Sequence, residues 1–546
     1  MNQLFIDYYW PLDILLHVLF ILPVAGAILR WTSVWQIKEY RWDRLKDYFS
    51  TRSGKLFILS PWIFIEIVAG VYLLTAQAWG DSNLIAIIFL PWCVLIALEC
   101  ARVVRRPARP LWTTKTIITS LASFTTLAVL YVLIRLALPE TSIPTSHFGV
   151  LSLLLAAVPL IVTIWIELLR PLVNSQKKST LHQAKIKLQK VNPIVIGITG
   201  SFGKTSTKHF LKIILEKRWK VLATPKNINV DIGVAQTILS SLKEDHEILI
   251  VEMGAYRPGE IAAICNLVSP IIGVITAVSG QHLSLFGSLE IIKKTKAELL
   301  QCLPASGLAI LNRDLQACRE IAQYSPAPVH YFSVLDNAHI YATDIVVIPH
   351  QIKFTLHIGL QRTRAQVSLN GVQALPAVLA AVAVANHLAM PIEEIVAGLD
   401  RLSAPAGTMQ LKNGRHHYSV IDDSYNANPD GFLAALDYLA LFTDKRKIVI
   451  TPGMLELGTD SDKHHRSVGQ RIAEVADLLI ITKRDFSRPL SESAMAAGMS
   501  AEQIIVDERI DRLIENKLSD ITTDDIVLIE GRVQTKIRNF IVPDIS

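Results

Sequence analysis

The chain has 546 residues, of which 51% are hydrophobic and 19% are charged, with a formal net charge of +6. This length predicts several domains, and the high hydrophobicity excludes a disordered chain. Five cysteines without a CxxC pair exclude a disulfide-stabilised secreted scaffold. In the first half, the basic residues cluster beside apolar runs. This distribution is typical of a membrane protein, so we expect no nucleic-acid partner.

Five apolar runs follow one another in the first 170 residues. A helix needs about 20 apolar residues to cross a bilayer, so residues 1–172 are predicted to form a bundle of about five transmembrane helices. The runs are Leu12–Leu29, Leu56–Trp79, Leu84–Leu98, Ile117–Leu138 and Phe148–Ile166. Glu66 lies inside the second run and is expected to face other helices, with His17 as a candidate partner.

The loops between these runs predict the orientation of the chain. The first and third loops and the segment after the fifth run are rich in Lys and Arg, whereas the second and fourth loops have neither. By the positive-inside rule, the N-terminus lies outside and everything after residue 170 is cytoplasmic. We therefore expect a multi-pass protein of the cytoplasmic (inner) membrane, with the lipid bilayer as a partner.

The pattern changes after the last apolar run. Residues 173–192 are polar and basic with spaced leucines, which predicts a linker helix near anionic headgroups. Residues 193–403 and 404–546 then alternate short apolar strands with helical stretches, as parallel α/β domains do. The expected strands are Pro193–Thr199, Ile248–Glu252, Ile271–Thr276, Leu308–Leu311, Ser419–Asp422, Ile448–Thr451, Leu478–Ile481 and Ile526–Ile529.

A glycine-rich segment between the first of these strands and a helix predicts a phosphate-binding loop (P-loop). It comprises Thr199, Gly200, Ser201, Phe202, Gly203, Lys204, Thr205 and Ser206. Glycines let backbone N–H groups face a polyphosphate, and the start of a helix adds partial positive charge. Lys204 would reach the β- and γ-phosphates, and the Thr205 hydroxyl would bind Mg²⁺. Ile198 stands where the strict motif has glycine, so the loop is a variant.

This loop resembles that of the Mur ligases, the ATP-dependent amide-forming enzymes of peptidoglycan synthesis. Further segments resemble the same family in the same order, from about Pro193 to Ile541. They are Asn227–Gly233, Glu252–Glu260, His282–Leu289, Lys296–Glu298, Leu311–Asp314, Asp422–Pro429 and Gly453–Gly458. The block Asp422–Pro429, which reads DDSYNANP, resembles the branch that adds D-alanyl-D-alanine, the MurF-like branch.

The resemblance implies a fold, cofactors and a reaction. Residues 193–403 would be the central ATP-binding domain, a P-loop ATPase domain on a parallel sheet, and residues 404–546 a Rossmann-like C-terminal domain. ATP and Mg²⁺ would convert a carboxylate to an acyl phosphate, which an amine then attacks. Thr205 and Glu252 would hold one Mg²⁺ and His282 a second, with Lys296 carbamylated as a further ligand. Taken singly, Glu252, His282 and Lys296 can also be structural residues.

Other residues receive binding roles from the same resemblance. Asn312, Asp314 and Asp423 would contact ATP, with Asp423 on the ribose. The residues expected on the substrates are Asn229, Tyr425, Asn426, Asn428 and Arg532. A histidine, His464 or His465, follows the segment Gly453–Gly458 as in the MurF-like branch.

Departures from the family pattern leave alternatives open. Gly371–Ala377 lacks the His and Asn residues that seat adenine, the turn Ala406–Thr408 lacks its arginine, and Glu530–Val533 lacks a Lys and a Ser. The membrane region also stands where Mur ligases bind a UDP-sugar peptide. We expect a membrane-anchored ligase that joins a cell-wall precursor, which is lipid-linked in one hypothesis, to an amino acid or a dipeptide such as D-Ala-D-Ala. The alternatives are a nucleotide-binding scaffold for cell-wall synthesis proteins, a poly-glutamate-type ligase and, least favoured, an ATP-driven transporter.

Overall fold

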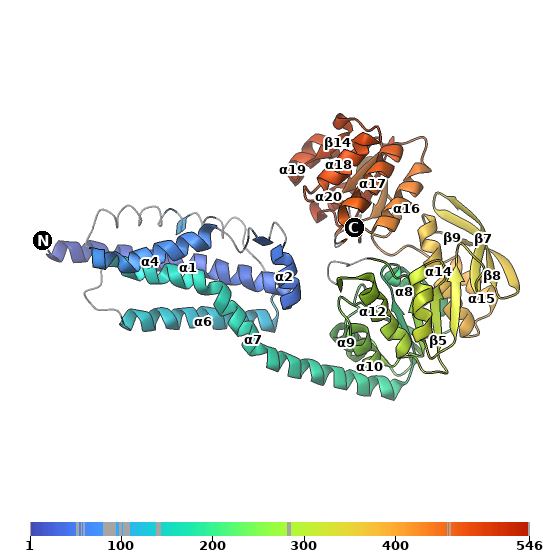
Figure 1. Cartoon of the computed structure of the whole chain (residues 1–546), viewed down its shortest axis with the longest axis horizontal. Coiled ribbons are helices and arrows are strands. Elements are labelled where there is room, and N and C mark those ends of the chain that lie inside the picture. The colour runs from blue at the N-terminus through green and yellow to red at the C-terminus, as the bar shows by residue number, and fades with distance from the viewer. Residues whose placement is uncertain are drawn as a thin grey trace. The chain divides into compact units, whose positions relative to one another are not determined.

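The computed structural model divides the chain into two compact units, Met1–Gln176 and Lys177–Ser546, and each is described by itself (Figure 1). The structure describes residues 2–50, 54–55, 57, 61–79, 94, 96–97, 101, 110–137, 144–280, 286–455, 457 and 460–543. His282, Glu456 and most of the third apolar run lie outside these residues.

The first unit consists of helices in its described part. They are α1 (Asn2–Ile37), α2 (Trp42–Ser50), α4 (Pro61–Trp79), α6 (Thr114–Ala137) and the start of α7 (Pro144–Val191). Among the described residues, three segments are long and apolar enough to cross a membrane, Phe20–Ile37, Thr114–Ala137 and Gly149–Val191, and a shorter one covers Ile63–Thr75. The number of membrane crossings therefore stays a prediction.

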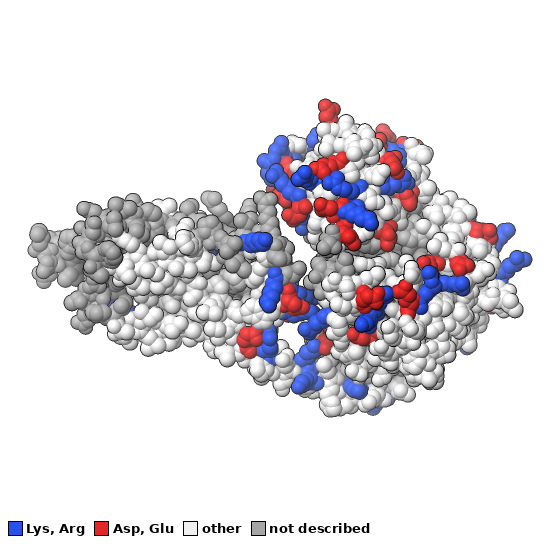
Figure 2. All heavy atoms as spheres, in the orientation of Figure 1, with Lys and Arg blue, Asp and Glu red and all other residues white. Residues whose placement is uncertain are grey.

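Polar bonds and apolar packing hold these helices together. The indole of Trp35 on α1 is fully buried and donates to the Thr163 hydroxyl of α7 at 3.2 Å. Trp165 of α7 donates to Thr126 of α6 at 2.9 Å. Glu66 is buried, as expected for a carboxyl facing other helices, while the side chain of His17 lies outside the described residues. On the face seen in Figure 2, the described helices of this unit carry few charges, whereas both signs are interspersed on the second unit.

The predicted linker is the C-terminal part of α7, which continues without a break from the last apolar run. Ala184 and Leu188 on this part are buried in the core of the second unit. Lys185 donates to the carbonyl of Asn266 at 2.9 Å, and Lys187 donates to that of Leu239 at 2.8 Å. Two basic side chains of the predicted linker therefore bind carbonyls of this unit, and the position of the linker near lipid headgroups stays a prediction.

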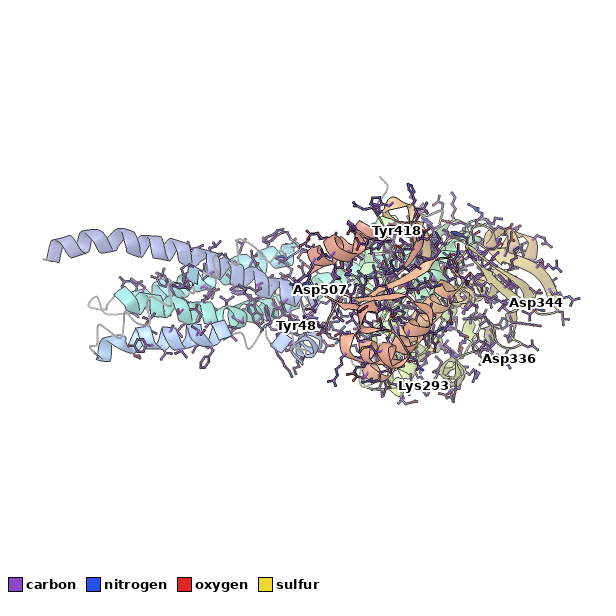
Figure 3. All side chains as sticks on the ribbon, turned by 90° about the horizontal axis from the view of Figure 1, so that it is seen from above. Tyr48, Lys293, Asp336, Asp344, Tyr418 and Asp507 are labelled. Carbon is purple, nitrogen blue, oxygen red and sulfur yellow. The ribbon has the colours of Figure 1, made fainter. Side chains whose placement is uncertain are left out.

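A nine-stranded sheet forms the first half of the second unit, with the order β2-β3-β1-β4-β5-β6-β7-β8-β9. Its strands are β1 (Ile194–Thr199), β2 (Val221–Ala223), β3 (Ile248–Glu252), β4 (Ile272–Ile275), β5 (Leu308–Asn312), β6 (Val329–Ser333), β7 (Ile340–Ile348), β8 (Gln351–Ile358) and β9 (Gln361–Val367). Strands β2 to β7 are parallel, and β8 and β9 add an antiparallel edge. Asp344, labelled in Figure 3, lies where the register of β7 shifts.

Helices cover both faces of this sheet. The core on one face includes residues of α8 (Lys204–Leu215), α14 (Leu375–His387) and α15 (Ile392–Leu399). The core on the other includes residues of α7, α9 (Asp231–Ser241), α10 (Glu260–Val268), α12 (Leu289–Gln301) and α13 (Gln316–Ile321). Strand β1 lies between β3 and β4, so the connections leave it in opposite directions. In parallel α/β sheets, ligands bind outside the carboxyl ends of the strands at such a switch point.

A six-stranded sheet forms the second half, with the order β10-β11-β15-β12-β13-β14. Its elements are β10 (Gln410–Asn413), β11 (Ser419–Asp423), α16 (Pro429–Ala440), β12 (Arg446–Thr451), α17 (Ser461–Val475), β13 (Leu478–Ile481), α18 (Ser487–Ala496), β14 (Ile504–Val506), α19 (Ile510–Leu513), β15 (Asp525–Glu530) and α20 (Thr535–Ile541). All neighbouring pairs are parallel except β10 and β11. The two parallel α/β sheets predicted from the alternating pattern are confirmed.

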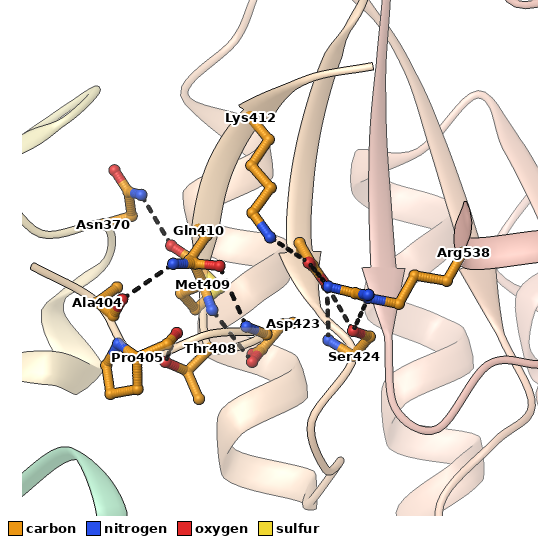
Figure 4. A network of polar contacts seen from close by, with 12 residues as sticks. Asn370, Ala404, Pro405, Thr408, Met409, Gln410, Lys412, Asp423, Ser424 and Arg538 are labelled. Atoms are coloured by element: carbon orange, nitrogen blue, oxygen red, sulfur yellow. Dashed lines mark hydrogen bonds and ion pairs between the residues drawn. The ribbon is translucent and has the colours of Figure 1, made fainter. Parts of the chain in front are cut away.

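The connection between the two sheets is held by the network in Figure 4. The amide of Asn370 donates to the carbonyl of Met409 at 2.8 Å, and the backbone N–H of Met409 donates to Asp423 at 3.2 Å. The hydroxyl of Tyr438 on α16 donates to the side-chain carbonyl of Asn370 at 2.8 Å. This network joins the end of the first half to β11 and α16.

Candidate functional site

The glycine-rich turn between β1 and α8 has a backbone that only glycine adopts readily. Gly200 has φ +155° and Gly203, the residue before α8, has φ +80°. A Cβ atom on Gly200 would lie 2.0 Å from the Thr276 hydroxyl oxygen. No described side chain caps the first turn of α8, which leaves its N–H groups available to an anion. The backbone N–H of Ser201, in contrast, donates to the carbonyl of Ala277 at 2.8 Å.

Lys204 begins α8 and is folded back over the turn. Its ammonium donates to the carbonyl of Gly200 at 2.6 Å and to that of Ser201 at 3.1 Å. Burial lowers the pKa of Lys204, and the negative charge of Glu252 opposes this effect. A phosphate at the turn would offer the same ammonium a charged acceptor in place of two neutral carbonyls.

Glu252 ends β3, in register with Ile198 of β1, and its carboxylate is almost completely buried. One oxygen, Oε2, accepts from the Thr205 hydroxyl at 3.1 Å and from the Lys208 ammonium at 2.8 Å. The other, Oε1, accepts from the Asn229 amide at 3.2 Å. Thr205, Lys208 and Asn229 lie 47, 44 and 23 positions from Glu252 in the sequence. The fold brings them to one carboxylate because β3 lies between β1 and β2.

Lys208 is the residue of this cluster that the sequence analysis missed. It lies one helical turn beyond Lys204, in the series Gly203-Lys204-Thr205-Ser206-Thr207-Lys208. Residues four apart share one face of a helix, so the spacing of the two lysines could have indicated that both face the site. A lysine on a surface helix is ordinarily exposed, so the spacing alone did not predict that Lys208 is buried at the site.

Lys296 of α12 also lies at this site. It lines a pocket with Gly200, Ser201, Lys204, Asn229, Tyr256 and Phe286. Burial and, after it, the positive charge of Lys204 lower the pKa of Lys296 to about 7. The neutral amine that results is the form that reacts with CO₂ to give a carbamate, so the environment fits the carbamylation that the resemblance implies.

The donor set fits Mg²⁺, which prefers oxygen ligands. Thr205 and Glu252 supply a hydroxyl and a carboxylate side by side, and Lys296 would supply carbamate oxygens. Within the described part of the chain, no three His, Cys, Asp or Glu side chains are grouped as metal ligands. His282, the predicted ligand of a second ion, lies outside that part.

Asn312 and Asp314, predicted to contact ATP, already bind the protein. The Asn312 amide donates to the carbonyl of Thr276 at 3.2 Å, and its side-chain oxygen accepts from the N–H of Asp314 at 2.9 Å. Asp314 accepts from the Ser333 hydroxyl and from the N–H of Val334 at 2.9 Å. These bonds tie the ends of β4, β5 and β6 together, and any contact of the two residues with a nucleotide stays a prediction.

In the second sheet, Asp423 and Glu530 end neighbouring strands in register. Burial raises the pKa of Asp423 to about 7 and raises that of Glu530 well above its ordinary value. The Met409 N–H also donates to Asp423, so this residue, predicted on the ribose, supports the connection between the sheets.

The remaining predicted residues of this half divide into structural and exposed ones. The side chain of Asn428 caps α16 by accepting from the N–H of Gly431 at 3.0 Å. His465 accepts from the N–H of Met454 at 2.9 Å and bonds the carbonyl of Ser461 at 2.7 Å, which defines a neutral structural imidazole. Tyr425 and Arg532 are exposed, and Asn426 is half-buried. Binding roles for these three residues and for Asn428 remain predictions.

Comparisons with known proteins decide the family. Residues 198–385 match the Mur ligase middle domain, and residues 408–533 match the Mur ligase glutamate ligase domain. The chain is 31% identical over 343 residues to a UDP-N-acetylmuramoyl-tripeptide--D-alanyl-D-alanine ligase of Haemophilus influenzae, of which it covers 73%. The chain belongs to the Mur ligase family. The resemblance drawn from the sequence motifs is thus confirmed.

Other relatives and solved structures agree with this assignment. The Mycobacterium tuberculosis and Escherichia coli ligases of the same description are 32% and 33% identical over 334 and 291 residues, which are 59% and 52% of this chain. The chain spans 65% and 62% of the length of these two relatives. Among structures, MurF from Acinetobacter baumannii superposes with a TM-score of 0.60 at 25% identity, covering 67% of this chain and 80% of its own. MurF from Thermotoga maritima in complex with ADP gives 0.58 and 25%, covering 67% and 83%.

The matched ranges contain the candidate site of this Mur-family chain. Gly200, Lys204, Glu252 and Lys296 all lie within residues 198–385, and Asp423 and Glu530 lie within residues 408–533. Both ranges begin after α7. The apolar helices of the first unit therefore lie outside the segments on which the family assignment rests.

Proposed function

We propose that this chain is a membrane-anchored, ATP- and Mg²⁺-dependent amide ligase of the MurF type that serves peptidoglycan synthesis. The observation that carries the proposal is the cluster around the β1–α8 turn. There Lys204, Thr205, Glu252 and Lys296 come from three separate elements to one place beside an open helix N-terminus. The T. maritima relative is in complex with ADP, which supports a nucleotide as a ligand of this chain.

The proposed reaction has two steps. A carboxylate oxygen of the donor attacks the γ-phosphorus of ATP, which gives an acyl phosphate and ADP. The amine of the acceptor then attacks the acyl carbon, the amide forms, phosphate leaves and the amine loses a proton. Mg²⁺, when bound, supplies positive charge to the phosphoryl oxygens.

The chain's own residues would orient and neutralise charge in these steps. The Lys204 ammonium would leave the carbonyls of Gly200 and Ser201 for the β- and γ-phosphates, because a charged acceptor binds it more strongly. The N–H groups at the start of α8 would hold the phosphate chain. The bond from the Thr205 hydroxyl to Glu252 directs the oxygen lone pairs of Thr205 away from the carboxylate and toward a cation.

For substrates we propose the pair in the relatives' names, a UDP-N-acetylmuramoyl-tripeptide donor and a D-alanyl-D-alanine acceptor. A lipid-linked precursor is an alternative donor, favoured by the apolar helices that precede the ligase unit. The basic loops between the apolar runs support an orientation with the ligase unit on the cytoplasmic side. In cells, a fluorescent protein that folds in the cytoplasm should fluoresce when fused after Ser546, and a periplasmic phosphatase should be active when fused before Met1. The opposite pattern would reverse the topology.

The experiment that tests the ligase is Mg²⁺-dependent phosphate release from ATP by the full chain in detergent. Release should require both the muramoyl-tripeptide and D-alanyl-D-alanine, and Lys204→Ala should lower it by at least about 100-fold, as expected for loss of a charge on transferring phosphate. The matched control is Lys212→Ala, two turns along α8 and exposed, which should retain the wild-type rate. Release that does not need the two substrates would refute the proposed reaction.

A nucleotide-binding scaffold is the second candidate, and one observation favours it. Gln373 lies in the segment that lacks the family's adenine-seating residues. Both polar atoms of its side chain are buried without a hydrogen-bond partner in the described structure. A scaffold would bind ADP but, in the assay described above, would release no phosphate from ATP with either a soluble or a lipid-linked donor.

A further inference from the structure

The ion pair between Lys208 and Glu252 stands out among the charged groups of the second unit. Its nitrogen and oxygen are 2.8 Å apart, and the two side chains are only 6% and 1% exposed. The Lys208 ammonium also donates to the carbonyl of Lys226. Buried charges are tolerated when they are paired and hydrogen-bonded, and both conditions are met here. Lys208 is therefore a permanent neighbour of the carboxylate proposed to hold Mg²⁺.

The carboxylate of Glu252 has few acceptor positions left. An ionised carboxylate offers about four lone-pair positions. Thr205 and Lys208 occupy Oε2, and Asn229 occupies one position of Oε1. These bonds fix the rotation of the carboxylate, and one position on Oε1 remains for a metal ion or its water.

The charges around the pocket disfavour a free divalent cation. Lys208 neutralises Glu252, and Lys204 adds a further positive charge beside it. The acidic groups that act on Lys296, Glu260 and Glu298, are engaged elsewhere: Glu298 accepts from two N–H groups at the start of α10, and Glu260 pairs with Arg257. A bound nucleotide adds several negative charges, so it changes the net charge of the site from positive to negative.

We propose that Lys208 is a positioning residue that makes divalent-metal binding depend on the nucleotide, so that the metal enters with the phosphates rather than before them. Lys208 does this by holding the Glu252 carboxylate in one orientation and cancelling its charge while the nucleotide is absent. The inference rests on the proposed function, because it concerns the site at which that function places ATP and Mg²⁺.

The test measures Mn²⁺ binding, by the loss of its free electron paramagnetic resonance signal, to the full chain in detergent with and without ADP. Wild type should bind free Mn²⁺ weakly and bind it much more tightly with ADP. Lys208→Met should bind free Mn²⁺ about tenfold or more tightly than wild type, since an unneutralised Glu252 attracts the cation. The matched control is Lys212→Met on the same helix, whose side chain is 42% exposed and 3.5 Å from Glu216. It should bind Mn²⁺ as wild type does.

A double variant separates charge from packing. Glu252→Gln with Lys208→Met removes both charges and should bind free Mn²⁺ no more tightly than wild type. If Lys208→Met is unfolded without metal while the double variant folds, Mg²⁺ should restore the fold of the single variant, because the ion replaces the lost ammonium. Failure of Mg²⁺ to restore it would overturn the proposal. Unchanged or weaker free Mn²⁺ binding by a folded Lys208→Met would also overturn it.

The outcomes for this inference and for the proposed function are distinct. Binding of free Mn²⁺ involves neither ATP nor turnover. If wild type binds neither ADP nor Mn²⁺ with ADP, the proposed function fails. If wild type binds Mn²⁺ only with ADP but Lys208→Met behaves identically, the role of Lys208 fails and the proposed function stands.

Discussion

Replacing Gly200 with alanine should disrupt the turn between β1 and α8, and it should destabilise the chain more than the same replacement at Gly259. The new Cβ would lie 2.0 Å from the hydroxyl oxygen of Thr276 and 2.9 Å from the backbone nitrogen of Ala277. Separations below 3.0 Å require the surrounding atoms to move. The backbone of Ala277 is anchored by its carbonyl, which accepts from Ser201, so the turn itself must shift.

The magnitude follows from two contributions. Alanine with positive φ costs about 1–2 kcal/mol relative to glycine, and φ is +155° at Gly200. Forcing an extra methyl group into a packed region costs about 1–3 kcal/mol more. The free energy of unfolding of the second unit should therefore fall by about 2–5 kcal/mol.

Gly259 provides the matched control. It has φ +88° at the start of α10, and no described atom lies within 4 Å of the position of its added Cβ. Gly259→Ala should therefore cost only the backbone contribution of about 1–2 kcal/mol and retain ADP binding, whereas Gly200→Ala should lose it. The assay is urea unfolding of the full chain in detergent, read by proteolysis of the second unit, together with ADP titration. Equal destabilisation by the two variants would refute the role of the close contact with Thr276.

Two further predictions concern α7 and the carboxyl pair. Leu188 is 6% exposed in the core of the second unit, whereas Ile186 on the same helix is 54% exposed. Leu188→Ala should therefore destabilise this unit by about 2–4 kcal/mol and Ile186→Ala by about 0.5 kcal/mol, measured by urea unfolding; similar losses would show that α7 does not pack here. The pKa of Asp423 is raised to about 7 by burial, while an unfolded aspartate ionises near 3.9. The folded state thus holds an extra proton between about pH 4 and 7, so stability should fall as pH rises through this window, and Asp423→Asn should flatten the fall. If the unfolding midpoint changes by the same amount between pH 5 and pH 8 in the wild type and in Asp423→Asn, this prediction is contradicted.

The cluster at Glu252 shows where sequence reasoning succeeded and where it stopped. The turn Thr199–Ser206 could be recognised as a candidate phosphate-binding site because its chemistry is local: glycines, a lysine and a helix start lie within eight adjacent positions. Its binding of phosphate stays a prediction. Lys208 needed the fold, because its pairing with Glu252 depends on β3 lying next to β1. The same holds for the adjacency of Asp423 and Glu530, which follows from the register of β11 with β15.

Some motif residues were identified correctly as part of the family but take on other contacts in the structure. Asn428 caps α16, and His465 is a neutral core residue. A motif match shows that the residues occur together in the family, but it does not distinguish residues that contact a ligand from residues that support the fold. Their hydrogen-bond partners show that both side chains support the fold, and a substrate contact of Asn428 stays a prediction.

From local patterns alone, the sequence established the family and the two parallel α/β regions with the order of their strands along the chain, and it predicted a phosphate-binding turn. Each of these depends on patterns within a few residues: alternating apolar runs, glycine at positive φ and short motifs. The tertiary structure decided which strands are neighbours, which lysine neutralises Glu252 and that α7 continues into the core of the ligase unit. These features arise from long-range packing, in which the position of a side chain depends on elements that are distant in the sequence.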